Sequence, residues 1–428
     1  MFELTTGTVI IGGGQAGLSL SHHLARRRQR HVVLERGRVG ERWRSERWDS
    51  LTLLTPNWLN RLDGGSAHEA PEGFLSRAGF ARYLNDHPRR PYVHEHVEVV
   101  GVEPWRGGFV VVTDAAAWRA RNVVLATGDC AVPRIPPVAV SAPAWIRQLP
   151  SSRYRNPVQL APGGVLVIGA GSSGQQIAAE LRRAGRDVVL AVGRHVRAAR
   201  RYRGRDIWHW LDRLGDLEVS IDDVPDPDAA RQTPALPLSG ANGGEQLDLD
   251  VLQRLGVTIT GRFEGFQDAR VSFADDLDAN VADAEQRLQR LLDRIDAHVE
   301  ETLPEWPHEA QRLRAVRIER QPDGIDLGAR GIANVIWATG YRREYPWLHA
   351  PALDEAGELV HRHGITDVPG LYALGLRFQR RRSSHFIGGV GADAAFLAGE
   401  IGARRAVRSR YRTPSSRRAA YGYIPSWR

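Results

Sequence analysis

The sequence predicts an α/β protein with two doubly wound, parallel-sheet domains, the second inserted into the first. Two glycine triplets predict this class, because each lies between a short apolar run and a helical pattern. The first is Gly12-x-Gly14-x-x-Gly17, and Gly169-x-Gly171-x-x-Gly174 follows about 157 positions further along. Two further apolar runs, 121–128 and 334–340, both end in Ala-Thr-Gly. Strands that alternate with helices in this way form parallel sheets.

The first triplet has every part of a Rossmann-like dinucleotide site. An apolar strand precedes it, a helical pattern follows it, and Glu35 ends the next strand. The first glycine permits the tight turn, the second lets the backbone approach a pyrophosphate, and the third lets helix and strand pack closely. The phosphates then lie at the helix N-terminus, and Glu35 can accept hydrogen bonds from a ribose. The predicted ligand contacts are Gly12, Gly14, Gln15, Ala16, Gly17 and Glu35.

The second triplet differs at the end of its second strand, where no acid follows. Arginines stand there instead, beginning with Arg194 and continuing through the 197–203 cluster. Forked guanidinium donors suit a 2′-phosphate, so the pattern favours NADPH over NADH. The alternative is a solvated basic loop. The predicted contacts are Gly169, Gly171, Ser172, Ser173, Gly174, Arg194, Arg200 and Arg201.

Composition excludes several kinds of chemistry. Cys130 is the only cysteine, which excludes an internal disulfide and a redox-active cysteine pair. No lysine is present, which excludes Schiff-base chemistry. No apolar run is long enough to span a bilayer, and the first residues lack a basic leader, so we expect a cytoplasmic protein. His94 and His96 have no third ligand nearby, so we expect no metal.

The net charge of +8 comes from one end of the chain. Residues 401–428 hold eight arginines and no acid. We interpret this end as a solvated tail and do not expect a nucleic-acid partner, although contact with nucleic acid or an acidic membrane is the alternative. The expected domain boundaries are 1–150 and 326–405 for the first domain, 160–325 with a helical segment at 274–302 for the second, and 406–428 for a disordered tail.

Two dinucleotide sites in one chain imply electron transfer, and the natural acceptor at the first site is a flavin. Here the sequence resembles the class B flavoprotein monooxygenases, the flavin-containing monooxygenase-like group, over nearly its whole length. The resemblance rests on both glycine triplets, Glu35-Arg-x-x-x-Gly40-x-x-Trp43-Arg44, Thr55-Pro-Asn-Trp58, the two Ala-Thr-Gly runs and Pro369-Gly-Leu-Tyr-Ala-Leu-Gly375.

The resemblance implies a reaction. NADPH reduces FAD, the reduced flavin captures O₂ as a C4a-(hydro)peroxyflavin, and one oxygen atom passes to nitrogen, sulfur or carbon of a small organic substrate. It also implies FAD contacts beyond the first triplet, at Arg36, Trp43, Arg44, Thr55, Ala126, Thr127, Gly128, Gly375 and Gly389. Asn57, Ser384 and His385 are the implied active-site residues. A homodimer is left open.

Three departures from the family pattern leave alternatives. Pro150 and Leu54 stand where the family places a histidine and an asparagine, and Leu376 follows Gly375 where many FAD proteins have an acid. An NADPH oxidase or electron-transfer reductase is therefore the rival enzyme, and a flavin- or nucleic-acid-binding protein that uses the arginine tail is the rival non-enzyme. Trp208 and Trp210 could line a cleft or belong to the core.

Overall fold

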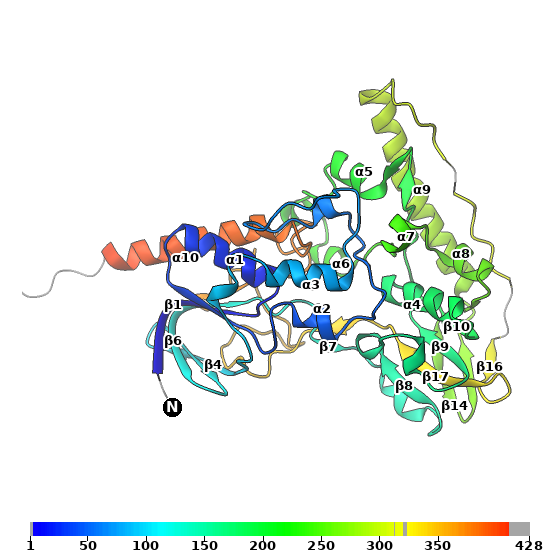
Figure 1. Cartoon of the computed structure of the whole chain (residues 1–428), viewed down its shortest axis with the longest axis horizontal. Coiled ribbons are helices and arrows are strands. Elements are labelled where there is room, and N and C mark those ends of the chain that lie inside the picture. The colour runs from blue at the N-terminus through cyan, green and yellow to red at the C-terminus, as the bar shows by residue number, and fades with distance from the viewer. Residues whose placement is uncertain (1–2, 312, 320–322, 411–428) are drawn as a thin grey trace, which may run out of the picture.

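Two sheet-centred domains lie side by side in the computed structural model, which describes residues 3–311, 313–319 and 323–410 (Figure 1). The predicted α/β class is confirmed. In the first domain the order of the main sheet is β3-β2-β1-β6-β5-β4, and β19 also pairs with β6. Its strands are β1 (Glu3–Ile11), β2 (His31–Leu34), β3 (Val93–His94), β4 (Val99–Trp105), β5 (Gly108–Thr113), β6 (Ala117–Leu125) and β19 (Leu371–Ala373). Strands β3, β2, β1, β6 and β19 are parallel, as βαβ connections require.

One face of this sheet is covered by helices from opposite ends of the chain. In Figure 1, α1 (Gln15–Arg26) lies beside α10 (Val390–Arg410). Their apolar sides share one core with β1 and β2, which includes Leu20, Leu24 and Leu397. α2 (Glu41–Ser45) and α3 (Arg77–Asn85) follow β2 along the chain. The C-terminal segment thus returns to complete the first domain, as the sequence predicted.

The second sheet is fully parallel, in the order β13-β10-β9-β17-β8. Its strands are β8 (Arg147–Pro150), β9 (Gly164–Ile168), β10 (Val188–Ala191), β13 (Thr258–Thr260) and β17 (Ile332–Trp337). α4 (Ser172–Arg183) and α8 (Leu249–Arg254) pack on one face. The other face carries a small antiparallel sheet of β14 (Phe263–Gln267), β15 (Arg270–Phe273) and β16 (Gly324–Asp326).

This pairing corrects the expected domain boundaries. β8 and β17 both belong to the second sheet, so that sheet extends beyond the 160–325 range on both sides. The reason is symmetry: β6 pairs with β1 in the first sheet and β17 pairs with β9 in the second, so each sheet has its own strand that ends in Ala-Thr-Gly. The two chain crossings then pair with each other, as β7 (Val132–Pro133) with β18 (Tyr341–Arg342).

Between β10 and β17 the chain adds a helical layer to the second domain. It comprises a hairpin of β11 (Arg201–Tyr202) and β12 (Arg205–Asp206), with α5 (Ile207–Arg213), α6 (Pro227–Gln232), α7 (Ala241–Gly244) and the long α9 (Leu277–Thr302). The apolar stripe of α9, which includes Leu288 and Ile295, is buried against Trp208 and Trp210. Core packing is therefore the role of that stripe and of both tryptophans.

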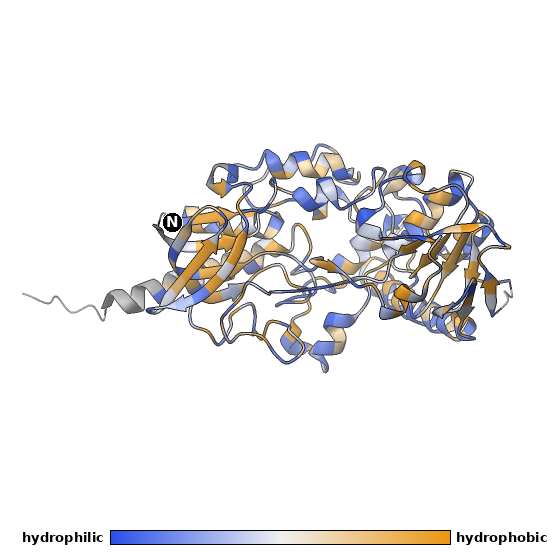
Figure 2. Cartoon of the chain, turned by 90° about the horizontal axis from the view of Figure 1, so that it is seen from below, coloured by the Kyte–Doolittle hydropathy of each residue, from blue (hydrophilic) through white to orange (hydrophobic). Residues whose placement is uncertain are grey.

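Apolar residues concentrate on the strands of both sheets (Figure 2). Among the helices that the structure describes, none is both long and apolar enough to cross a bilayer. The arginine-rich tail expected from residue 406 overlaps the end of α10, and its residues 411–428 lie outside the described part of the chain.

Candidate cofactor and active site

The first glycine triplet forms a tight turn whose close contacts require glycine. Gly12 has φ +114°, and a Cβ there would clash with the carbonyl oxygen of Ala126. A Cβ on Gly17 would clash with the carbonyl oxygen of Gly12. Gly14 is different, because its φ of −84° suits any residue and a Cβ would have no atom within 4 Å. The turn therefore leaves room beside Gly14, at the N-terminus of α1, where anions are stabilised.

The second triplet repeats this geometry. Gly169 has φ +108°, and a Cβ there would meet the carbonyl oxygen of Ala338. A Cβ on Gly174 would clash with the carbonyl oxygen of Gly169, whereas Gly171 has φ −71° and an open Cβ position. Each Ala-Thr-Gly run thus supplies the alanine carbonyl on which the first glycine of a triplet packs. This explains the shared ending of β6 and β17.

Glu35 is fixed over the first glycine turn. Its Oε2 accepts a hydrogen bond from the backbone N–H of Gly13 at 2.6 Å, and its Oε1 accepts one from Gly37 at 2.9 Å. A carboxylate has further lone pairs beyond these two bonds. A ribose hydroxyl can therefore still bond to Glu35, as the sequence analysis expects.

Other predicted FAD contacts gather at the carboxyl ends of the first sheet's parallel strands. Gly128 has φ +73° and no atom within 4 Å of its Cβ position. Gly375 lies against Ala16 of α1, and Gly389 lies against the backbone of Ser383 just before α10. The turn after β1, the end of β6 and the start of α10 are therefore brought together. These residues fit FAD, because three backbone segments without bulky side chains converge on the open helix end.

The remaining predicted FAD contacts are spread around this centre. Trp43 packs edge-on against Phe80, and Arg44 donates to backbone carbonyls of residues 39 and 81. The Thr55 hydroxyl donates to Asn60 Oδ1 at 2.6 Å. Arg36 is exposed. Gln15 and Thr127 lie half-buried beside the glycine turn, as Ser172 and Ser173 do at the second, where the Ser172 hydroxyl donates to the Leu236 carbonyl.

Two of the three predicted active-site side chains hold loops in place. The Asn57 amide donates to the Ala70 carbonyl at 2.9 Å and accepts from the Leu75 N–H at 3.0 Å. The Ser384 hydroxyl accepts from the N–H groups of Arg380 and Arg381 at 3.0 and 2.9 Å. Both side chains are therefore engaged with backbone, and the structure assigns them a supporting role.

His385 retains a candidate chemical role. It lies in the turn that leads into α10, and its Nδ1 is buried with no hydrogen-bond partner within the described chain. Burial, and to a lesser degree Arg377, lower the pKa of His385 to about 4, against an opposing effect of Asp129, which follows Gly128. The imidazole is therefore neutral near pH 7 and has an unused nitrogen.

The arginine cluster after β10 does not present a set of free guanidinium groups. Arg200 is 1% exposed and pairs with Asp206, while Arg197 is buried between Asp248 and Glu285. The proposed 2′-phosphate contact at Arg200 is thus corrected, because its guanidinium is already engaged by a buried carboxylate.

Two predicted phosphate contacts stay accessible. Arg201 is exposed and donates to the Gly243 carbonyl at 2.9 Å. Arg194 is exposed directly after β10 and has no ion-pair or hydrogen-bond partner among the described residues. The sequence analysis missed the acids that neutralise the cluster, since most of them lie far from it in the chain.

The relatives of this chain agree with the geometry. Residues 9–210 match the family model of pyridine nucleotide-disulphide oxidoreductases. The uncharacterized oxidoreductase CzcO-like of Geobacillus kaustophilus is 33% identical over 399 residues, which is 92% of this chain and 97% of that protein. The chain belongs to the CzcO-like oxidoreductase family. It is therefore an oxidoreductase, as the sequence predicted.

Proteins named as monooxygenases are among the more distant relatives of this CzcO-like oxidoreductase. Indole-3-pyruvate monooxygenase YUCCA1 of Oryza sativa subsp. japonica is 30% identical over 201 residues, which is 44% of this chain and 47% of that protein. The flavin-containing monooxygenase from Stenotrophomonas maltophilia has the same fold, with a TM-score of 0.64, 21% identity, and coverage of 94% of this chain and 99% of that one.

The name of the matching family model refers to a disulphide, which this CzcO-like chain cannot form within itself. Cys130 is the only cysteine in the sequence, so the chain contains no cysteine pair. Among the described residues no group of three or more His, Cys, Asp or Glu side chains could hold a metal ion.

Proposed function

We propose that this chain is an FAD-dependent, NADPH-consuming monooxygenase that inserts one atom of O₂ into a small organic substrate at nitrogen, sulfur or carbon. The observation that carries the proposal is the pair of matched glycine turns in one chain. We call the turn at residues 12–17 the first cradle and the turn at residues 169–174 the second cradle. Each has an open position, at Gly14 and at Gly171, on the N-terminus of a buried helix. Cys130 is the only cysteine, so a reduced flavin held in the first cradle would have no cysteine pair to reduce, which leaves O₂ as its acceptor.

The two cradles differ in the residue that reads the ribose. Glu35 beside the first cradle accepts hydrogen bonds and suits the free hydroxyls of FAD. Arg194 beside the second cradle is a free cation and suits the 2′-phosphate of NADPH. When bound, the flavin supplies the redox and oxygen chemistry. The chain supplies binding, orientation and a site that excludes water.

His385 is the side chain that we assign to the reacting region. Its neighbours are Phe386, which packs edge-on against Trp208, and two charged side chains, Arg377 and Asp129, which shift its pKa in opposite directions. A neutral imidazole in this position can accept or donate one hydrogen bond at Nδ1, according to its tautomer. His385 thus lies where the first domain meets the helical layer of the second.

Purified holoprotein tests the proposal. NADPH consumption, O₂ uptake and H₂O₂ release are measured together, without substrate and with a panel of amines, sulfides and ketones. A substrate that accelerates NADPH consumption, lowers H₂O₂ yield and gains one ¹⁸O atom from ¹⁸O₂ supports monooxygenation. Stoichiometric H₂O₂ with every compound would favour the second candidate, an NADPH oxidase. The sequence observation that favours this candidate is that Pro150 and Leu54 stand where the family has a histidine and an asparagine. Protein that binds no flavin overturns both.

A further inference from the structure

A segment of the first domain runs across the second and packs into two of its cores. We call residues 48–59 the strap. Its first part places Trp48 and Leu51 in the core that β9, β10 and α4 share. Its second part packs Leu54, Trp58 and Leu59 against the cluster that contains Trp208 and the buried face of α9. Leu53, between these two parts, packs in the core of the first domain, so the strap is held by both domains.

The centre of the strap is gripped by two side chains of the second domain. The Leu54 carbonyl accepts from an Arg200 guanidinium nitrogen at 2.7 Å and from Trp208 Nε1 at 3.2 Å. Arg200 Nε donates to Asp206 Oδ2 at 3.0 Å, and Asp206 Oδ1 accepts from the backbone of Trp208 at 3.0 Å. We call Arg200, Asp206 and Trp208 the clasp. Removing either the Leu54 carbonyl or the Arg200 charge from water without a partner would cost free energy. The clasp gives both groups a partner.

The backbones of the two domains also approach closely around the clasp. The Arg200 guanidinium lies over the Phe74 ring, with 4.6 Å from Cζ to the ring centroid. A Cβ on Gly240 would clash with the Leu53 carbonyl, and one on Gly244 would come within 2.9 Å of the Phe74 ring. Two glycines of the second domain thus allow close contact with the strap at Leu53 and with the nearby Phe74 ring.

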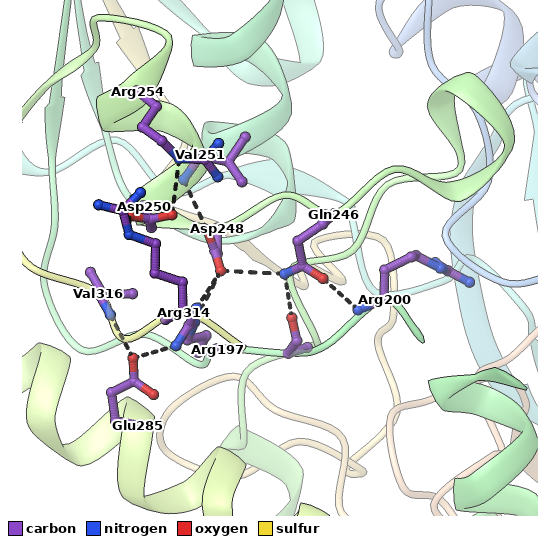
Figure 3. Close-up of polar contacts among 11 residues, drawn as sticks. Arg197, Arg200, Gln246, Asp248, Asp250, Val251, Arg254, Glu285, Arg314 and Val316 are labelled. Carbon is purple, nitrogen blue, oxygen red and sulfur yellow. Dashed lines mark hydrogen bonds and ion pairs between the residues drawn. The ribbon is translucent and has the colours of Figure 1, made fainter. Parts of the chain in front are cut away.

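Arg200 is itself anchored deeper in the second domain (Figure 3). Its backbone N–H donates to Gln246 Oε1 at 2.7 Å, and Gln246 Nε2 lies 3.3 Å from Asp248 Oδ2. Asp248 holds Arg197 at 2.8 Å, and Arg197 also pairs with Glu285 of α9. The clasp is therefore the outer end of a buried polar network that reaches the long helix.

We infer that Arg200 is a positioning residue: through the clasp it fixes the second domain, and with it the nicotinamide, against the flavin side of the first domain. This inference rests on the proposed function. The strap contains Thr55 and Asn57, and its last residue reaches the turn before α10, where the Leu59 carbonyl accepts from the Gly388 N–H at 3.0 Å. Hydride transfer needs the reacting atoms about 3–3.5 Å apart, and a misplacement of about 1 Å can cost a hundredfold in rate.

The test compares the holoenzyme with Arg200→Lys and Trp208→Phe. Lysine keeps a charge for Asp206 but lacks the fork that also reaches Leu54, and phenylalanine keeps a ring but loses the Nε1 donor. Arg183→Lys is the matched control, because Arg183 pairs with Glu245 within the second domain. Flavin content, NADPH affinity and the anaerobic rate of flavin reduction by saturating NADPH and NADH are measured for each.

We expect Arg200→Lys to slow reduction by NADPH and NADH equally, roughly tenfold to a hundredfold, with flavin content unchanged. Trp208→Phe should slow it in the same direction, by about two- to fivefold, and Arg183→Lys should match the wild type. Unchanged rates in both variants would overturn the inference, and a selective loss of NADPH affinity in Arg200→Lys would return Arg200 to the 2′-phosphate. If Arg200→Lys does not fold, the Trp208→Phe rate decides. A wild type that NADPH cannot reduce would refute the proposed function instead.

Discussion

At the scale of single residues, the partners of an arginine decide what it can bind. Arg194 and Arg200 lie six positions apart, yet Arg194 is exposed with no partner in the described part of the chain, and Arg200 is buried against Asp206. A guanidinium that is already neutralised by a buried carboxylate cannot move to a phosphate without leaving that carboxylate unpaired. Arg194 is therefore the residue of the two that we propose as the contact of the 2′-phosphate.

Arg194→Ala should weaken NADPH binding and leave NADH binding nearly unchanged. A hydrogen bond to a charged group contributes about 1.5–3 kcal/mol, which corresponds to roughly tenfold to a hundredfold in affinity. Titration of the holoenzyme with each nucleotide measures the effect. Arg201→Ala is the comparison, because Arg201 is exposed but already donates to Gly243. Equal losses for NADPH and NADH in Arg194→Ala would show that Arg194 does not contact the 2′-phosphate.

The position of the arginine cluster after β10 could be predicted from the sequence, but which of its arginines are free to bind a phosphate could not. The end of β10 and its missing acid are local features, so they are visible in the sequence. The acids that neutralise the cluster are not all local: Asp248 is 51 positions from Arg197, and Asp296 is 93 positions from Arg203. Asn57 and Ser384 show the same limit, since their polar atoms are satisfied by loop backbone that no sequence spacing indicates.

At the scale of elements, the two glycine cradles offer a matched pair of variants. Gly14 and Gly171 both have φ values that valine can adopt, and both have an open Cβ position. Gly14→Val should therefore fold but yield colourless protein, because the side chain occupies the space where the pyrophosphate approaches. Gly171→Val should keep its flavin and lose reduction by NADPH. Flavin absorbance, circular dichroism and anaerobic reduction measure the three properties.

Steric controls come from the third glycine of each triplet. A Cβ on Gly17 or Gly174 would clash with a backbone carbonyl, so Gly17→Ala and Gly174→Ala should impair folding itself. If Gly14→Val retained a full complement of FAD, the first cradle would not be the flavin site.

The network under the helical layer should contribute strongly to stability. Asp248 caps α8 by accepting from the Val251 N–H at 3.0 Å, and it also pairs with Arg197, both side chains being 4% exposed. Asp248→Ala leaves that guanidinium without its main partner, and we expect a loss of about 3–5 kcal/mol in the free energy of unfolding. Urea unfolding of the holoprotein measures it.

Asp226 is the control for Asp248, because it caps α6 on the surface without a buried ion pair. Asp226→Ala should cost only about 0.5–2 kcal/mol, the usual value of an N-cap. Similar losses in the two variants would mean that the buried pair adds nothing beyond the cap.

At the scale of the whole molecule, internal symmetry was the best guide, and the main error came from not following it. Both triplets and both Ala-Thr-Gly runs are local patterns, so two sheets could be predicted from them. The sequence analysis assigned the second run to the first domain, although the symmetry places it beside β9. The strap could not be predicted, because Trp48 and Leu51 look like ordinary core residues of their own domain and pack instead in the other one.

Buried histidines should make the whole molecule sensitive to mild acid. Burial lowers the pKa of His361 and of His385 to about 4, and it also lowers the pKa of His22, His31, His87, His195 and His209. Each of these groups is neutral in the folded chain and binds a proton more readily once unfolded. Their contribution to stability is therefore complete above a pH of about 6.5 and is lost progressively as the pH falls from there to about 4.

Thermal unfolding of the holoprotein between pH 8 and about pH 3.5 measures this effect. We expect a nearly constant Tm at the alkaline end and a steep fall below pH 6.5, at about 1.4 kcal/mol per pH unit for each histidine that stays neutral. His385→Gln and His361→Gln should each make the fall shallower, because glutamine takes up no proton on unfolding. His94→Gln is the control, since His94 is exposed and water can solvate it in either state. A fall of equal steepness in the wild type and both buried-site variants would place the acid sensitivity in the carboxylates. In that case it should appear mainly below pH 4.5, where Asp63, Asp187 and Glu41, whose pKa values are lowered by their partners, take up protons.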